Sequence, residues 1–472
     1  MTAVFSADEL AQWCGGQWER PPVRAVRGVG HDTRTLSAGM LYVALRGPQQ
    51  DGHDFVGAAW SAGAAGGLVE RRWLERAAGA RERRVPLLVV EDTRRALADL
   101  ACGYRRRLAP AMIGITGSMG KTTVKDMLAD MTARRAPTAR TFGNWYNEIG
   151  LPLRLLAMPS ATRIGVFELG INHPGEMAPL CAILQPERAV VTNIAPAHIE
   201  FFENVEAIAE EKAQLLRCLP ARGVAVLNRD DACFERLRAR TPCPLLTVSF
   251  SRPADLQCIA FDGARREAIL VEAAQGSRHR LRLSLPGRHQ AANAMMAALM
   301  ARDIGVPWPD ILEAARTFAS ARMRWQETEA GGVRLVNDAY NANPTSMRAA
   351  VQAFAESSCE PQTWLALGDM LELGAGAEKA HRALGRWLAR GHWQGLILLG
   401  EHSRALAEGA AEAGFDAASI FPCDSTVHMA ELLHRHVRRG AAVLLKASRG
   451  MRLEEAVRHF EERTQAHSNG QG

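Results

Sequence analysis

Several features that would assign the chain to a specialised class are missing from the sequence. No run of about 18 apolar residues occurs, so we expect no membrane span. The N-terminal segment lacks the basic start and apolar core of an export signal, so we expect a cytoplasmic protein. The nine cysteines are scattered without a Cys-x-x-Cys pair, which favours reduced, mostly buried thiols over a zinc or redox site.

The excess of positive charge is also small. Lysine plus arginine total 57 and aspartate plus glutamate total 51, so the formal net charge of the 472-residue chain is +6. The basic residues do not form the footprint of a nucleic-acid binder, so we expect no nucleic-acid partner and, at most, an anionic small-molecule substrate. Hydrophobic residues make up 47% and charged residues 23%, values that exclude large-scale disorder.

Length and pattern predict an α/β protein of about three domains. No period of 20 to 50 residues repeats, which excludes a solenoid. We predict an N-terminal domain over 1–84, a central domain over 85–321 and a C-terminal domain over 322–472. In the central segment, short apolar strands alternate with helical stretches, which is typical of a parallel sheet covered on both faces. The C-terminal segment predicts a second, smaller α/β domain.

The most informative segment is Gly114–Thr123, where an apolar strand runs into a glycine-rich turn and a helix. Backbone N–H groups of such a turn face a phosphate, with Lys121 placed for the terminal phosphates and Thr122 for Mg²⁺. Ile115 stands where a standard P-loop has glycine. We predict a nucleotide site rather than a plain strand-to-helix turn. Its residues are Gly117, Ser118, Met119, Gly120, Lys121, Thr122 and Thr123.

Two polar side chains follow later strands of the central segment. Glu168 ends one apolar strand, and His198 lies in the loop after the next. Ligands gather at the carboxyl ends of parallel strands, so both are candidate metal ligands together with Thr122. Taken alone, a strand-end glutamate or a loop histidine is more often a surface or structural residue. Lys212 lies on a predicted helix among glutamates, and this pattern by itself indicates a solvated lysine that pairs with one of them.

In this order and spacing, these segments resemble the Mur ligase family, ATP-dependent amide ligases that build the peptide of bacterial cell-wall precursors. The family pattern is a Thr-Gly-x-x-Gly-Lys-Thr loop, a strand-end Glu, an Asn-x-x-x-x-His loop and a helix with a special lysine. It is matched here by Thr116–Thr122, Glu168, Asn193–His198 and Lys212. The resemblance implies ATP, two Mg²⁺ ions and a carbamylated Lys212. The implied catalytic residues are Lys121, Glu168, His198 and Lys212, and the implied metal ligands are Thr122, Glu168, His198 and Lys212.

Further segments resemble the family member that joins D-alanyl-D-alanine to UDP-N-acetylmuramoyl-tripeptide. The most specific piece is the Tyr340–Pro344 motif within Asn337–Met347, and Asn144–Leu153, Asn172–Glu176, Leu367–Gly374 and Lys446–Arg449 also fit. Asp32–Arg34 and Asp51–Phe55 resemble the family's uridine-nucleotide domain. The implied substrate-binding residues are Asp32, Thr33, Arg34, Asp51, Gly52, His53, Asn144, Asn147, Tyr340, Asn341, Asn343, Ser448 and Arg449. The implied ATP contacts are Asn293 to adenine, Arg324 to phosphate and Asp338 to ribose.

The resemblance also implies the architecture and the reaction. A small N-terminal α/β domain would hold the uridine nucleotide, a central P-loop domain would hold ATP, and a C-terminal Rossmann-like domain would bind the dipeptide and close on ATP. An acyl phosphate would link the two chemical steps. We expect small-molecule substrates and a monomer. The departures from the family pattern are Asn337 for Asp, Ala447 for Gly, Gln290 for Asn, and Met323 where Gly is common.

Four other functions compete with this interpretation. The family's third-residue-adding ligase would carry an Asp-Asn-Pro-Arg motif, which this sequence lacks. Folylpolyglutamate synthase would lack the first segment. A P-loop motor or switch ATPase would lack the set Glu168, His198 and Lys212, and a simple UDP-sugar-binding module would lack Lys121 and Thr122.

Overall fold

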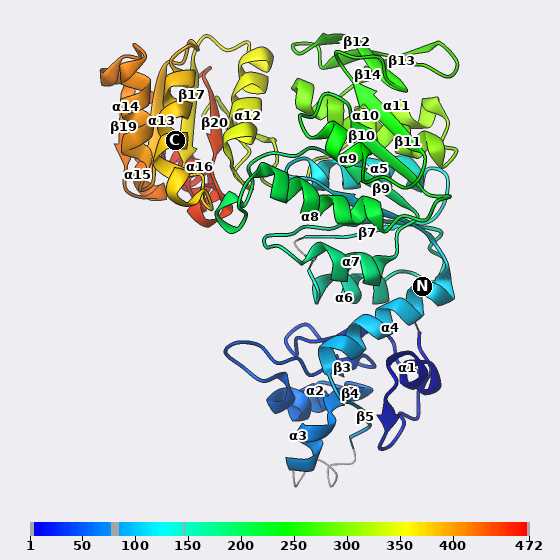
Figure 1. Cartoon of the computed structure of the whole chain (residues 1–472). Coiled ribbons are helices and arrows are strands. Elements are labelled where there is room, and N and C mark those ends of the chain that lie inside the picture. The colour runs from blue at the N-terminus through cyan, green and yellow to red at the C-terminus, as the bar shows by residue number, and fades with distance from the viewer. Residues whose placement is uncertain (1–3, 77–84, 144, 146, 470–472) are drawn as a thin grey trace.

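The computed structural model describes residues 4–76, 85–143, 145 and 147–469. In these residues the chain forms three sheets of five, nine and six strands, each with its own helices. Figure 1 shows them as three lobes, with the N-terminal lobe in blue, the central lobe in cyan and green, and the C-terminal lobe in yellow to red. The predicted three-part α/β architecture is confirmed. No helix among the described residues is long and apolar enough to cross a membrane.

The first sheet has the strand order β1-β5-β4-β3-β2, with β1 antiparallel to β5 and the others parallel. Alternate residues of its strands fill two apolar clusters, one on each face. Its elements are α1 Ala7–Cys14, β1 Gln17–Trp18, β2 Val29–Gly30, β3 Leu41–Val43, η1 Gly52–Phe55, α2 Val56–Ser61, β4 Gly66–Glu70, α3 Arg71–Arg76 and β5 Leu87–Val90.

The place of β5 corrects the predicted boundary between the first two domains. The sequence pattern assigned this strand to the central segment, after residue 84. In the structure β5 pairs with β4, with Leu87 opposite Gly67 and Leu88 opposite Leu68. Leu87 packs in a cluster made only of first-domain residues, and Leu88 packs with Leu41, Val43 and Leu68 of the same sheet in a cluster that extends into the central domain. A division at 84/85 is therefore wrong for this strand.

Helix α4 (Thr93–Leu108) carries the chain from the first sheet to the second. Asp92 is its N-cap: the side chain accepts hydrogen bonds from the backbone N–H groups of Arg94 and Arg95 at 2.8 and 3.0 Å. Figure 1 shows α4 lying between the blue and green lobes. Its apolar residues, such as Leu97 and Leu100, belong to a cluster that includes residues of both domains.

The central sheet has the order β14-β13-β12-β11-β10-β9-β6-β8-β7. Strands β6 to β12 run parallel, which confirms the predicted parallel sheet. Strands β7, β11 and β12 were not predicted, nor were β13 and β14, which add an antiparallel edge. Strand β6 lies between β8 and β9, so the carboxyl ends of these three strands meet. The elements are β6 Ala111–Thr116, α5 Lys121–Ala133, β7 Thr138–Arg140, α6 Gly150–Leu156, β8 Ile164–Glu168, α7 Met177–Leu184, β9 Arg188–Val191, η2 Ile199–Phe201, α8 Val205–Arg217, β10 Val224–Asn228, α9 Phe234–Arg238, β11 Leu245–Ser249, β12 Leu256–Asp262, β13 Glu267–Glu272, β14 Ser277–Arg282, α10 Arg288–Asp303 and α11 Trp308–Thr317.

The third sheet has the order β15-β16-β20-β17-β18-β19, parallel except for β15. Asn337 of β16 lies opposite Leu445 of β20, so the residues that follow them emerge side by side. The elements are β15 Gln326–Ala330, β16 Val333–Asn337, α12 Pro344–Ser357, β17 Thr363–Gly368, η3 Gly374–Gly376, α13 Ala377–Leu388, β18 Gly395–Leu399, α14 Ser403–Glu412, η4 Ala417–Ser419, β19 Ile420–Cys423, α15 Thr426–His436, β20 Ala442–Lys446, η5 Arg449–Met451 and α16 Glu454–Asn469.

Among the contacts that join the central and C-terminal domains, two involve segments next to predicted site residues. At Gly287, directly before α10, an added Cβ would lie 2.7 Å from the Cβ of Ala353 on α12, so the two backbones approach closely. At the second place, η2 lies against the loop that precedes η3. These contacts bring residues of both domains to one site.

Candidate active site

The glycine-rich turn between β6 and α5 has a backbone that only glycine adopts without strain. Gly117 has φ +143°, and an added Cβ would lie 1.9 Å from Thr192 Oγ1. Gly120 has φ +77°, and an added Cβ would lie 2.4 Å from Asn293 Oδ1. Helix α5 begins directly after the turn, so its first unpaired N–H groups are available to an anion.

The loop after β9 holds this turn in place. Ser118 N donates to Asn193 O at 2.9 Å, and Met119 N donates to Asn193 Oδ1 at 3.1 Å. The Ser118 hydroxyl donates to Ala195 O at 2.8 Å and accepts from Ala195 N at 2.9 Å. The segment Asn193–His198, which follows its strand in the sequence, therefore lies beside the glycine-rich turn.

Lys121 is the first residue of α5, and its side chain folds back over the turn. Its Nζ donates to Gly117 O at 2.9 Å and to Ser118 O at 3.3 Å. Burial lowers the pKa of Lys121; Glu168 opposes this effect, and Arg324 adds to it. No carboxylate of the described residues lies within ion-pair distance of Nζ. A phosphate that entered here would therefore meet a cation bound only to neutral carbonyls.

Thr122 and Glu168 place two oxygen ligands next to the turn. Thr122 Oγ1 donates to Glu168 Oε2 at 2.8 Å, and Glu168 is 4% exposed at the end of β8. Hydroxyl and carboxylate oxygens suit Mg²⁺, which keeps several waters and takes further ligands from phosphates. No cluster of three His, Cys, Asp or Glu side chains that could hold a metal occurs among the described residues.

His198 lies before η2 with a left-handed backbone, at φ +56°. Its Nδ1 is 2.5 Å from Oε2 of Glu372, a residue of the C-terminal domain. Burial lowers the pKa of His198, while the Glu372 carboxylate opposes this effect. His198 lines the same cavity as Thr122 and Glu168, so the predicted metal set is partly brought together.

Lys212 is the fourth member of the predicted metal set. Its side chain is 2% exposed on α8, and it makes no hydrogen bond or ion pair with another residue in the described part of the chain. Burial lowers the pKa of Lys212 well below its usual value, and the charge of Lys121 adds to the effect. A buried neutral amine is the form that reacts with CO₂, so this environment suits the implied carbamylation.

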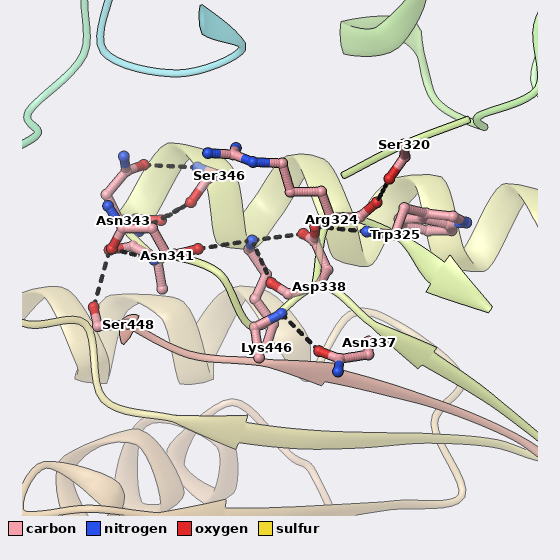
Figure 2. Close-up of polar contacts among 12 residues, drawn as sticks. Ser320, Arg324, Trp325, Asn337, Asp338, Asn341, Asn343, Ser346, Lys446 and Ser448 are labelled. Carbon is pink, nitrogen blue, oxygen red and sulfur yellow. Dashed lines mark hydrogen bonds and ion pairs between the residues drawn. The ribbon is translucent and has the colours of Figure 1, made fainter. Parts of the chain in front are cut away.

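Arg324, Asp338 and Lys446 come from the C-terminal domain. The Arg324 guanidinium lies 3.9 Å from the centre of the Tyr340 ring. Lys446 Nζ donates to Asp338 Oδ2 at 2.6 Å and to Asn341 O at 3.1 Å. Figure 2 shows Lys446 below the Asp338 carboxylate, in the network that these contacts form. The predicted ribose and phosphate contacts therefore lie on one face of the domain.

Most of these groups line one cavity of about 280 Å³ between the two domains, whereas Gly117, Ala195, Lys212 and Glu372 do not. Asn293 and His289 on α10 close one side, and burial lowers the pKa of His289 to about 4. The predicted nucleotide residues that line the cavity are Ser118, Met119, Gly120, Lys121, Thr122, Thr123, Asn293, Arg324 and Asp338. The predicted substrate residues that line it are Tyr340, Asn341 and Asn343.

The predicted uridine-nucleotide residues lie in the first domain, away from this cavity. Asp32 accepts from Arg34 N and from its guanidinium, which lowers the pKa of Asp32 to about 2. Thr33 lies between them. His53 is 1% exposed and accepts from Glu70 N at 3.0 Å through Nε2, while its Nδ1 lies 2.6 Å from Asp51 Oδ1. This geometry favours a supporting role for His53 over direct contact with a substrate.

The backbone at Gly52 is tightly packed: an added Cβ would lie 2.6 Å from both N and O of Leu45. Asn144 lies outside the described residues. Asn147 Oδ1 accepts from Gly150 N at 2.8 Å, at the start of α6. Asn343 caps α12 by accepting from Ser346 N at 2.8 Å.

Near the end of the chain, Ser448 is 3% exposed and accepts from Leu371 N at 2.9 Å, whereas Arg449 is exposed and pairs with Glu454. The contacts of Ser448 are thus internal to the C-terminal domain. Those of Arg449 leave it accessible at the surface.

The sequence interpretation did not select three residues that the structure brings to the site. Lys446 belongs to a segment that carried the resemblance, but its ion pair with Asp338 requires β16 and β20 to be neighbours. His289 precedes the predicted adenine contact by four positions and has no motif of its own. Glu372 lies in Leu367–Gly374, and its partner is 174 positions away.

Family models cover most of the chain. The Mur ligase family, catalytic domain, matches residues 25–105, the Mur ligase middle domain matches 115–301, and the Mur ligase, glutamate ligase domain, matches 321–449. A UDP-N-acetylmuramoyl-tripeptide--D-alanyl-D-alanine ligase of Bacillus subtilis (strain 168) is 32% identical over 441 residues, 92% of this chain and 93% of the relative. The chain belongs to the Mur ligase family.

Solved structures give the same result for this Mur ligase. MurF from Acinetobacter baumannii has 29% sequence identity and a TM-score of 0.87, and the match covers 98% of this chain and 99% of that one. MurF ligase from Thermotoga maritima, a complex with ADP, has 26% identity and a TM-score of 0.80 over 94% and 99% of the two chains. A ligase of Escherichia coli (strain K12) with the same name as the B. subtilis relative is 32% identical over 91% of this chain and 93% of its own length.

Proposed function

We propose that this Mur ligase joins D-alanyl-D-alanine to UDP-N-acetylmuramoyl-tripeptide, with ATP as the energy source and an acyl phosphate as the intermediate. The observation that carries the proposal is the cavity between the central and C-terminal domains. It combines the phosphate turn, the Thr122–Glu168 oxygen pair and Arg324. The names of the relatives supply the substrates. The enzyme would act as a cytoplasmic monomer.

In the first step, a carboxylate oxygen of the tripeptide attacks the γ-phosphorus of ATP, and ADP leaves. Lys121 neutralises charge on the β- and γ-phosphates, and Arg324 clamps phosphate oxygens from the opposite domain. Thr122 and Glu168 would hold one Mg²⁺ ion, which supplies further charge neutralisation when bound. His198 and a carbamylated Lys212 would hold a second ion. Asn293 would contact adenine, and Asp338 would accept from ribose hydroxyls.

In the second step, the amine nitrogen of the dipeptide attacks the acyl carbon, and inorganic phosphate leaves. The acyl phosphate would hydrolyse in water, so the site must be closed while it exists. Arg324 and Asp338 reach the cavity from the C-terminal domain, which means that this domain completes the site when it docks. Asn341 and Asn343 on the same domain would help to hold the dipeptide. Arg34 and Asp32 would hold the uridine nucleotide.

The experiment compares acceptors. The purified enzyme is given ATP, Mg²⁺ and UDP-N-acetylmuramoyl-tripeptide, with lysine or meso-diaminopimelate as the third residue. D-alanyl-D-alanine, a free diamino acid or buffer is then added. Among the three additions, we expect the pentapeptide product by mass spectrometry only with the dipeptide, and ADP release over many turnovers only when the UDP-tripeptide and the dipeptide are both present. ADP release without them would favour a motor or switch ATPase.

A further inference from the structure

Glu372 is a residue of the C-terminal domain that contacts the candidate metal ligand His198. Its Oε2 lies 2.5 Å from His198 Nδ1, and its backbone O accepts from Glu200 N at 3.3 Å. The contact is therefore made by both backbone and side chain across the domain boundary. The side chain of His198 is 18% exposed and that of Glu372 is 43% exposed, so solvent screens the pair only in part.

The loop that carries Glu372 is fixed on the C-terminal domain at each preceding residue. Asp369 accepts from Glu401 N at 2.8 Å through its carboxylate. Met370 N donates to His381 Nε2 at 3.0 Å, and Leu371 N donates to the Ser448 hydroxyl at 2.9 Å. Glu372 itself has φ +60°, a left-handed conformation that is rare for a residue with a side chain. The carboxylate is thus presented by a rigid support.

The chemistry of the contact determines which ring nitrogen of His198 is free. An ionised carboxylate can only accept hydrogen bonds, so the proton between Oε2 and Nδ1 belongs to the histidine. The neutral ring then has its lone pair on Nε2, and that nitrogen can bind a metal ion. Histidines that bind metals usually donate their other N–H to a carboxylate or a carbonyl, which fixes the tautomer and raises the basicity of the ligand.

We propose that Glu372 is a positioning residue that fixes the metal-binding tautomer of His198 when the C-terminal domain docks on the central domain. Docking would then complete the metal site as well as deliver Arg324 to the nucleotide. The proposal rests on the proposed function, since it assigns Glu372 to the site of that reaction. It also explains why the loop Leu371–Gly374 lies against η2 rather than in solvent.

The first test is the variant Glu372→Gln, which keeps the size of the side chain but removes the carboxylate. We expect kcat to fall about 10- to 100-fold, the usual effect of losing such a support, with KM for the UDP-tripeptide within about twofold. The matched control is Glu378→Gln, a glutamate of the same domain that is 70% exposed and contacts Arg382 at 3.6 Å. The control should behave as wild type.

The second test measures metal binding without turnover. Mn²⁺ is titrated into the full-length enzyme with a non-hydrolysable ATP analogue, and bound ion is followed by electron paramagnetic resonance. We expect Glu372→Gln to lower the affinity for one Mn²⁺ ion about 10- to 100-fold, and His198→Ala should lower the affinity for the same ion. In the His198→Ala background, adding Glu372→Gln should change Mn²⁺ affinity and kcat by less than about twofold, because Glu372 acts through His198.

Two results would overturn the inference: wild-type Mn²⁺ affinity in Glu372→Gln, or losses that add in the double variant. Neither depends on the acceptor substrate, because the titration contains none. If the wild-type enzyme made no pentapeptide, the proposed function would fail while the Mn²⁺ result still stood. If the wild-type enzyme made pentapeptide and Glu372→Gln left Mn²⁺ affinity unchanged, only the role proposed for Glu372 would be contradicted.

Discussion

The Lys446 ammonium lies 2.6 Å from the Asp338 carboxylate, at the ends of the neighbouring strands β20 and β16. Lys446 is 3% exposed, and its other partners are the carbonyls of Asp338 and Asn341. Asp338 Oδ1 accepts from Trp325 N at 3.1 Å. Both carboxylate oxygens are therefore oriented before a nucleotide arrives, which favours a positioned acceptor for ribose hydroxyls.

Removing the charge of Asp338 should weaken ATP binding specifically. In Asp338→Asn, Lys446 loses its only carboxylate partner among the described residues, and the ribose loses a charged acceptor. Hydrogen bonds to charged groups contribute about 1.5–3 kcal/mol, so we expect KM for ATP to rise about 10- to 100-fold. Steady-state kinetics with each substrate varied in turn measures this. An unchanged KM for ATP would contradict the assignment of Asp338 as a ligand of the nucleotide.

The substitution Lys121→Ala should abolish ligation while the UDP-substrate still binds. The Lys121 side chain lies in the phosphate turn of the central domain, whereas Arg34 is 86% exposed in the first domain. Arg34→Ala should have the opposite effect: it should lower the affinity for the UDP-substrate and leave the affinity for ATP near the wild-type value. Isothermal titration of each ligand with each variant measures both effects. Ligation that survives in Lys121→Ala would contradict the phosphate assignment.

Activity should depend on dissolved CO₂ through Lys212. Burial lowers the pKa of this lysine, so a larger share of its amine is neutral near pH 8, and only the neutral amine forms a carbamate. Enzyme freed of CO₂ should lose activity, which bicarbonate should restore, and the neutral share should fall as the pH is lowered. ¹³C nuclear magnetic resonance with labelled bicarbonate would detect the carbamate. Lys212→Ala, the control, should show neither signal nor restoration.

Met323 departs from the family pattern at a place where the backbone has φ +58°. The left-handed region costs a residue with a Cβ about 1–2 kcal/mol. Glycine avoids this strain but loses more chain entropy on folding, which offsets part of the gain. We therefore expect Met323→Gly to raise the free energy of unfolding by up to about 1 kcal/mol, measured by denaturant titration. Met347→Gly, at a fully buried position on α12, should destabilise the same domain.

The parts of the site that depend on local sequence could be predicted, and those that depend on domain docking could not. The turn before Lys121 carries its own glycines and helix start, so its role follows from adjacent residues. The pairing of His198 with Glu372 spans 174 positions and exists only because two domains meet. Asp338 and Lys446 become neighbours through sheet order, which the apolar pattern of a strand does not encode.

The fold shows the same distinction. Strand β5 was recognisable from its apolar run, but its sheet was not, because a buried strand reads the same in either domain. Its register with β4 placed it in the first domain. The antiparallel strands β13 and β14 were not predicted; β14 lacks an apolar run, because it is largely polar, with Arg278, Arg280 and Arg282.

The most direct test of the central claim follows an oxygen atom. The terminal carboxylate of the UDP-tripeptide is labelled with ¹⁸O, and the enzyme is supplied with ATP, Mg²⁺ and D-alanyl-D-alanine. An acyl phosphate intermediate requires that one labelled oxygen of the carboxylate leave with the inorganic phosphate when the amide forms. We therefore predict ¹⁸O-phosphate, detected by mass spectrometry, in equal amount to the pentapeptide. Pentapeptide accompanied by unlabelled phosphate would contradict the account.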